Sequence, residues 1–107
     1  MALKNYALNS VAVSQETDLV VPAADKEFES AGLIICNNEA TNVAAILVRL
    51  TTSANASKGM IWRGTLAAGE PFFVDSKVVI AASASPDKVR VISDQANVSF
   101  IFSGDES

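Results

Sequence analysis

The chain has 107 residues, of which 50% are hydrophobic and 19% are charged, and its formal net charge is −4. This length fits one domain with one core, and the hydrophobic fraction excludes an intrinsically disordered chain. The eight basic residues are scattered without a run. The clustered basic face that nucleic-acid binding requires is therefore missing, and no nucleic-acid partner is predicted.

The charged fraction is lower than the roughly 25% of a typical soluble domain. Two explanations fit this deficit: other subunits cover part of the surface, or the fold is compact and rich in alanine. We favour the first explanation and expect a homo-oligomer.

Residue types that carry catalysis and metal binding are scarce. The chain has no histidine and one cysteine, Cys36, so neither a zinc site nor a cysteine–histidine nucleophile is predicted. Cys36 ends an apolar run and is expected to be a buried, inert thiol. Asp25, Glu27 and Glu29 are close in sequence but match no calcium-binding loop. We predict no enzyme, no cofactor and no metal site.

The opening residues 1–6 lack the apolar stretch of a signal peptide. No run approaches the roughly twenty apolar residues of a membrane span. We therefore expect a protein that folds in a reducing cytoplasm, without a secretion signal and without a membrane partner.

Eight short apolar segments recur along the chain, each ended by turn residues. This spacing predicts an all-β fold, an antiparallel β-sandwich of about eight strands with a jelly-roll-like connectivity as one option. Residues 1–107 form one domain. The segments are Val11–Val13, Leu19–Val21, Leu33–Cys36, Val43–Leu50, Met60–Trp62, Phe72–Ile80, Val89–Ile92 and Val98–Phe102.

The first third of the chain contains the main ambiguities. Residues 1–13 are either an N-terminal arm or a first strand. Residues 23–31 open either a short helix or, as we favour, a turn followed by a strand from about Glu27. That strand is expected to place one set of residues on a single face: Phe28, Ser30, Gly32, Ile34 and Cys36.

The remaining chain shows clearer alternation. Residues 43–51 form the strongest strand, which directs Ala44, Ile46, Val48 and Leu50 to the core. Residues 52–59 are expected to form a protruding polar loop. The last strand alternates strictly at Val98, Phe100 and Phe102, and residues 104–107 are an acidic tail that we expect to be frayed.

Five apolar side chains are candidates for an interface: four lie on strand faces directed away from the expected core, and the fifth, Trp62, is the aromatic residue most plausibly exposed. Trp62 is also a candidate platform for a sugar ring, although a Trp in a core or interface is the commoner case. The candidate interface residues are Leu47, Ile61, Trp62, Ile92 and Ile101.

A series of motifs between residues 17 and 104 carries a family resemblance. The motifs are Leu19–Ala23 (LVVPA), Gly32–Asn38 (GLIICNN), Val43–Val48 (VAAILV), Gly64–Glu70 (GTLAAGE), Val78–Ser85 (VVIAASAS), Val89–Val91 (VRV) and Phe102–Gly104 (FSG). In this order they resemble the small β-sandwich virion proteins of tailed bacteriophages.

The resemblance implies a structural, non-enzymatic part of the virion. The first expectation is a head decoration or cement protein that binds the major capsid protein as a homo-oligomer, with a trimer favoured. A tail, neck or baseplate component is the nearest alternative. Such a protein assembles into the particle in the host cytoplasm. An alternative of another class is a carbohydrate- or receptor-binding module that uses Trp62 and the loop at residues 52–59.

Overall fold

The computed structural model describes residues 3–75 and 77–107. Within these residues the chain forms nine strands and no helix, which confirms the predicted all-β class. Every pairing between the strands is antiparallel. The strands are β1 (Leu3–Leu8), β2 (Thr17–Val20), β3 (Phe28–Asn37), β4 (Ala44–Thr51), β5 (Ser57–Leu66), β6 (Pro71–Val74), β7 (Val79–Ile80), β8 (Lys88–Ser93) and β9 (Val98–Glu106).

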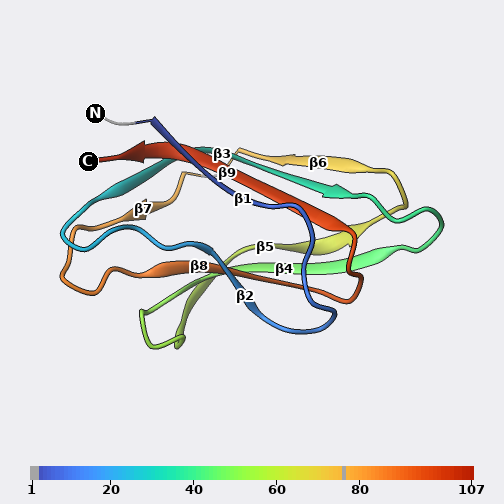
Figure 1. Ribbon diagram of the computed structural model, residues 1–107, viewed down its shortest axis with the longest axis horizontal. Helices are drawn as coiled ribbons and strands as arrows, with labels where there is room; N and C mark the ends of the chain where they lie inside the picture. Colours follow the sequence, from blue (N-terminus) through green and yellow to red (C-terminus); the bar gives the residue numbers. More distant parts are fainter. Residues whose placement is uncertain (1–2, 76) are drawn as a thin grey trace.

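Two sheets pack face to face, and Figure 1 shows them as an upper and a lower layer. Sheet A has the order β1-β9-β3-β6, and β7 also pairs with β3; sheet B has the order β2-β8-β4-β5. Because β6 and β7 pair with opposite halves of β3, they form one interrupted edge strand. Apart from that interruption, the chain changes sheet at every connection except the β4–β5 hairpin. The predicted antiparallel sandwich is therefore confirmed, and its strand order is that of an eight-stranded jelly roll, the connectivity that the sequence left as one option.

Inward-facing side chains of both sheets form a single core. Phe28 of β3 and Phe102 of β9 meet edge to face, with their ring centroids 5.9 Å apart, a favourable aromatic geometry. The strict alternation predicted for the last strand is confirmed, since Val98, Phe100 and Phe102 are all buried. The side chains buried in sheet B include Ala44, Ile46, Val48, Val89 and Val91.

The predicted strand at residues 28–37 is confirmed, because a turn at residues 24–25 precedes β3. Its predicted face is wrong beyond Ser30. A bulge between Ser30 and Gly32 shifts the register against β9. One extra residue reverses the facing of all residues that follow it, so Leu33 and Ile35 are buried and Ile34 is exposed.

The first and last strands of the described chain both belong to sheet A. Of the opening segment, Leu3–Leu8 form the edge strand β1, and residues 1 and 2 lie outside the described residues. The predicted segment Val11–Val13 is not a strand, because the chain turns at residues 13–14. The prediction of a frayed tail is also wrong: residues 104–106 lie in β9, between β1 and β3.

Two predicted segments are shorter or interrupted. The run Phe72–Ile80 divides into β6 and β7, and its residue 76 lies outside the described part of the chain. The predicted loop at residues 52–59 shrinks to residues 52–56, because Ser57 and Gly59 already pair with β4. This loop is the green tip that projects below the lower layer in Figure 1.

Candidate functional site

The five predicted interface residues lie at three separate places on the sandwich. Ile101 is on the outer face of sheet A. Leu47 and Ile92 are neighbours on the outer face of sheet B. Ile61 and Trp62 lie on the edge strand β5. A flat partner cannot contact both outer faces at once, so these five residues do not form a single contact surface.

A row of apolar side chains crosses the outer face of sheet A. Ile34 of β3 pairs with Ile101 of β9 on one side and with Phe73 of β6 on the other. Ile101 pairs in turn with Ala7 of β1. Ile34 and Ile101 are each 42% exposed and Phe73 is 59% exposed. Four adjacent strands thus present apolar surface to the solvent at one level of the sheet.

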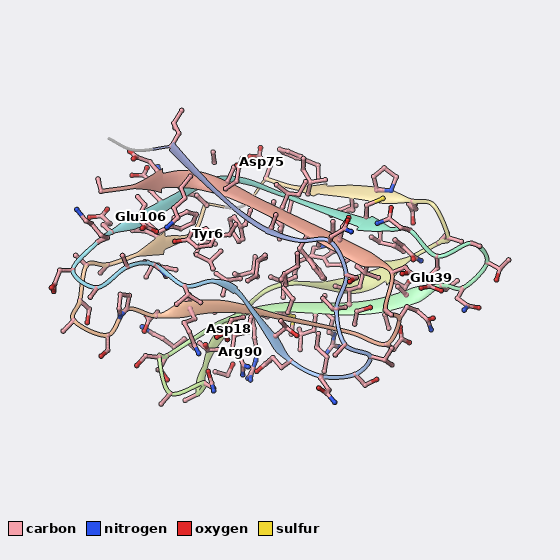
Figure 2. The ribbon with its side chains drawn as sticks, in the orientation of Figure 1. Tyr6, Asp18, Glu39, Asp75, Arg90 and Glu106 are labelled. Atoms are coloured by element: carbon pink, nitrogen blue, oxygen red, sulfur yellow. The ribbon has the colours of Figure 1, made fainter. Side chains whose placement is uncertain are left out.

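The residues beside this row are also uncharged. The neighbouring rows are Asn5–Ser103–Gly32 and Ser99–Cys36–Pro71. We call these rows, together with Ala7, Ile101, Ile34 and Phe73, the uncharged face. Along β3 and β9, charged side chains begin only at the next pair, Glu29 and Asp105. Asp75, two residues after Phe73, lies at the edge of this face (Figure 2). Depletion of charge is typical of the centre of a protein interface, and a contiguous exposed apolar patch marks an interaction site.

Phe73 lies across the backbone of Gly32. A Cβ added at Gly32 would be 3.0 Å from Cζ of Phe73, so the glycine leaves room for the ring. This packing fixes the ring on the sheet surface while most of it stays exposed, which gives the uncharged face a defined shape.

The outer face of sheet B has a groove of 410 Å³. Leu47 of β4 and Ile92 of β8, which are register partners, form its floor with Ala45. Arg63 of β5 lies on one wall and Asp94 on the other. The groove therefore brings together two of the predicted interface residues, and its volume is within the range of ligand-binding clefts.

A network of charged side chains lies beyond the groove on sheet B. Arg49 of β4 and Arg90 of β8 are register partners. Oε1 of Glu16 accepts hydrogen bonds of 2.6 Å from Nη2 of Arg49 and Nη1 of Arg90. Nε of Arg90 also donates to Asp18 at 2.6 Å. Figure 2 shows Asp18 and Arg90 on the side of sheet B that faces away from sheet A.

The arginines set the protonation of both acids. The hydrogen bond from Arg49 is the main reason that the pKa of Glu16 is lowered. Burial raises the pKa of Asp18, but hydrogen bonds from Arg90 and Lys88 outweigh burial and lower it. Since the charges in this network satisfy one another, we assign it a structural role: it fastens β2 and the residues before it to β8 and β4.

Trp62 closes the open side of the sandwich between β5 and β6. Its ring stacks on Phe72 with a centroid distance of 5.0 Å and an interplanar angle of 29°. The indole also lies over Gly64, where an added Cβ would be 2.9 Å from Cζ2. One ring face is therefore already covered by protein, and the partly buried indole packs against the core.

A buried carboxylate joins the two ends of the chain. Glu106 accepts hydrogen bonds from the hydroxyl of Tyr6 and, at 3.2 Å, from Nζ of Lys4. Figure 2 shows Tyr6 and Glu106 together between the two sheets. Burial raises the pKa of Glu106, but these hydrogen bonds outweigh it and lower the pKa. These hydrogen bonds hold the Glu106 carboxylate in place, so we assign it a structural role.

Within residues 3–75 and 77–107, no three His, Cys, Asp or Glu side chains are grouped so as to hold a metal ion. Cys36 is partly exposed rather than buried as expected, and its Sγ donates to Oδ1 of Asn38 at 3.2 Å. The described chain also contains no helix long and apolar enough to cross a bilayer.

Of the three exposed apolar side chains of the uncharged face, the sequence identifies Ile101 but not Ile34 or Phe73. The predicted register places Ile34 on the same face as Phe28, because alternation without a bulge continues unchanged beyond Ser30. Phe73 was one of two adjacent phenylalanines, and alternation alone does not say which one faces outward. The glycine at position 32 was the available signal, since small residues accommodate a ring that crosses the strand.

No family model and no curated protein matches the chain. One similar solved structure is that of the CBM22-1–GH10 modules of Clostridium thermocellum endo-1,4-β-D-xylanase 10B complexed with xylohexaose. It is 12% identical with a TM-score of 0.44, over 97% of this chain and 24% of that chain. Another is the T13 IBDV viral particle, which is 10% identical with a TM-score of 0.38, over 94% of this chain and 31% of that one. The chain thus spans less than a third of the length of either.

Proposed function

We propose that this chain is a structural, non-catalytic virion protein of a tailed bacteriophage that binds the assembled head as a decoration or cement protein. The uncharged face of sheet A carries the proposal, because it presents a contiguous apolar row with no charged side chain among its residues. The bacteriophage-like motifs at residues 17–104 add support from the sequence. The partner is the major capsid protein, and the chain binds as a homo-oligomer with a trimer as the favoured state.

The energetic argument rests on the exposed area of three side chains. Ile34, Ile101 and Phe73 retain about half of their exposure, so covering them contributes about 1 kcal/mol each. A protein that binds the assembled shell and not its separated subunits stabilises the shell by mass action. Many weak sites repeated over a symmetric lattice then reinforce the particle as a whole.

Co-sedimentation tests this proposal directly. The protein should pellet with intact heads of the bacteriophage that encodes it and should stay in solution with dissociated capsid subunits. Sedimentation with isolated tails instead would favour the tail, neck or baseplate alternative. Sedimentation with neither particle would contradict a virion role.

Two variants with matched exposure locate the contact. Phe73 on β6 is 59% exposed and Met60 on β5 is 58% exposed, and both lie on edge strands. We expect Phe73→Asp to lower the affinity for heads at least about tenfold, because it buries a carboxylate in an apolar contact. Met60→Asp should leave binding within about twofold of the unchanged protein. Equal losses in both variants would show that the uncharged face is not the docking surface.

A carbohydrate-binding role would use Trp62 instead. The indole already stacks on Phe72, so the geometry favours the uncharged face as the functional surface. Binding in a glycan screen that Trp62→Ala abolishes would count against our assignment.

A further inference from the structure

We propose that the sheet B groove binds an extended segment of a partner protein, one that carries a branched aliphatic side chain two residues away from an acidic residue. The groove lies on the opposite side of the sandwich from the uncharged face. This inference therefore does not rest on the proposed docking to a capsid, and the two can fail separately.

The floor of the groove selects an aliphatic side chain. Leu47 and Ile92 lie side by side on β4 and β8, and Ala45 continues the apolar floor. Leu47 and Ile92 are only partly buried by the rest of the chain. Burying one further Leu-sized side chain on such a floor contributes about 1–2 kcal/mol.

Arg63 on the wall selects the acidic residue. Within the described chain six of the eight basic side chains have a carboxylate within salt-bridge distance, namely Lys4, Arg49, Lys58, Lys77, Lys88 and Arg90. Arg63 is thus the one guanidinium there that has no acidic partner. It is the register partner of Leu47, so a carboxylate beside a side chain on the floor lies within its reach. A guanidinium offers two parallel donors to one carboxylate.

The other charges around the groove do not compete for such a ligand. Oδ1 of Asp94 already accepts the backbone N–H of Ala45 at 2.8 Å. Asp94 follows Ile92 by two residues on the far wall. Two strand spacings of about 4.8 Å across the sheet and about 7 Å along it place its Cα about 12 Å from that of Arg63. Glu16 is held by Arg49 and Arg90. Arg63 is therefore available to an incoming carboxylate.

An extended peptide fits this groove better than a small compact molecule. Leu47 and Ile92 lie on the two strands next to β5, so the middle of the floor is about one and a half strand spacings, about 7 Å, from Arg63. Alternate side chains of an extended segment that crosses the strands are also about 7 Å apart on one face, so one enters the groove while the second reaches Arg63.

Nuclear magnetic resonance on the ¹⁵N-labelled full chain tests the inference. The probes are blocked pentapeptides, acetyl-Gly-Leu-Gly-Asp-Gly-amide and its isosteric control with Asn in place of Asp. We expect the first to bind in the millimolar range, as a single buried side chain with one charged contact allows. It should shift the amide signals of Leu47, Arg63 and Ile92. The Asn peptide should bind at least about threefold more weakly.

Two variants complete the test. Arg63→Gln, at an exposed position, should remove the difference between the two peptides while leaving the rest of the spectrum unchanged. Phe73→Asp, on the opposite face, should bind both peptides as the unchanged protein does. No shifts up to about 10 mM peptide, or shifts outside the groove, would overturn the proposal. Equal binding of the Asp and Asn peptides to the unchanged protein would overturn the role of Arg63.

Discussion

Gly104 of β9 marks the closest packing between strands in the described core. A Cβ added there would lie 2.4 Å from the backbone oxygen of Glu29 and 2.7 Å from Cζ of Phe28. Neither neighbour can retreat easily, because protein cores are close-packed. We expect Gly104→Ala to lower the free energy of unfolding by about 2 kcal/mol or more, measured by chemical denaturation.

Gly59 of β5 provides the control for that substitution. A Cβ at this position would have no heavy atom within 4 Å. Gly59→Ala should therefore change the free energy of unfolding by no more than about 0.5 kcal/mol. A similar loss in both variants would mean that the alanine side chain, rather than the packing at Gly104, is responsible.

Glu106 shows how a residue near the chain terminus stabilises the fold. It is 8% exposed and accepts hydrogen bonds from Tyr6 and Lys4, which lie on β1. Glu106→Gln keeps the shape but removes the charge, and we expect a loss of about 1–2 kcal/mol in the free energy of unfolding. The exposed Glu27→Gln is the control. No difference between the two variants in thermal denaturation would contradict the role of Glu106.

At the scale of elements, acid should loosen β2 and the residues before it from β8 and β4. The pKa of Glu16 is lowered from its ordinary value of 4.5, chiefly by Arg49. Its pairing therefore stabilises the fold above about pH 4.5 and is lost as the pH falls through the lower value in the folded protein. We expect Glu16→Gln to be less stable than the unchanged protein at pH 7. The difference should shrink steadily below pH 4.5, as denaturation at a series of pH values would show.

The contrary result is a difference between the proteins that stays constant from pH 7 to pH 3. It would mean that the glutamine of the Glu16→Gln variant destabilises the fold through its altered packing, and not because the charge of Glu16 is lost. A network held by charge should also weaken in high salt, because salt screens exposed ion pairs.

The strands that could be predicted from the sequence are those with one polar and one apolar side. Val98, Phe100 and Phe102 alternate with less apolar neighbours, so both the strand and its inner face follow from the pattern. In β3 the run Leu33–Ile35 is apolar throughout, and the facing depends on a bulge that no local signal fixes. Alternation therefore identified the strand but misplaced Ile34.

The candidate site was harder to predict than the fold, because it depends on pairings distant in sequence. Leu47 and Ile92 could be identified as outward-facing but not as neighbours, since their pairing follows from the jelly-roll crossing. Ile34 and Phe73 join Ile101 only through the order of sheet A. Arg63 became informative only when the partners of the other basic residues were known.

At the scale of the whole molecule, the two outer faces differ in kind. Sheet A presents the uncharged face, whereas sheet B carries the groove and the network around Arg90. The two proposals above use this asymmetry, since one assigns docking to the uncharged face and the other assigns peptide binding to the groove.

Self-association follows from the same proposal. We expect sedimentation velocity at micromolar concentration to give a mass three times the 11.2 kDa of one chain. A monomer at all concentrations up to about 100 μM would contradict the favoured trimer, while leaving docking to a particle to be judged separately.

The most direct measurement of the central claim is hydroxyl-radical footprinting of the protein, free and bound to bacteriophage heads. Phe73 and Met60 are almost equally exposed in the free chain and lie on different sheets, so each reports on one side. If the uncharged face docks on the head, Phe73 becomes protected on binding and Met60 stays reactive. Protection of Met60 with Phe73 still reactive would contradict the account.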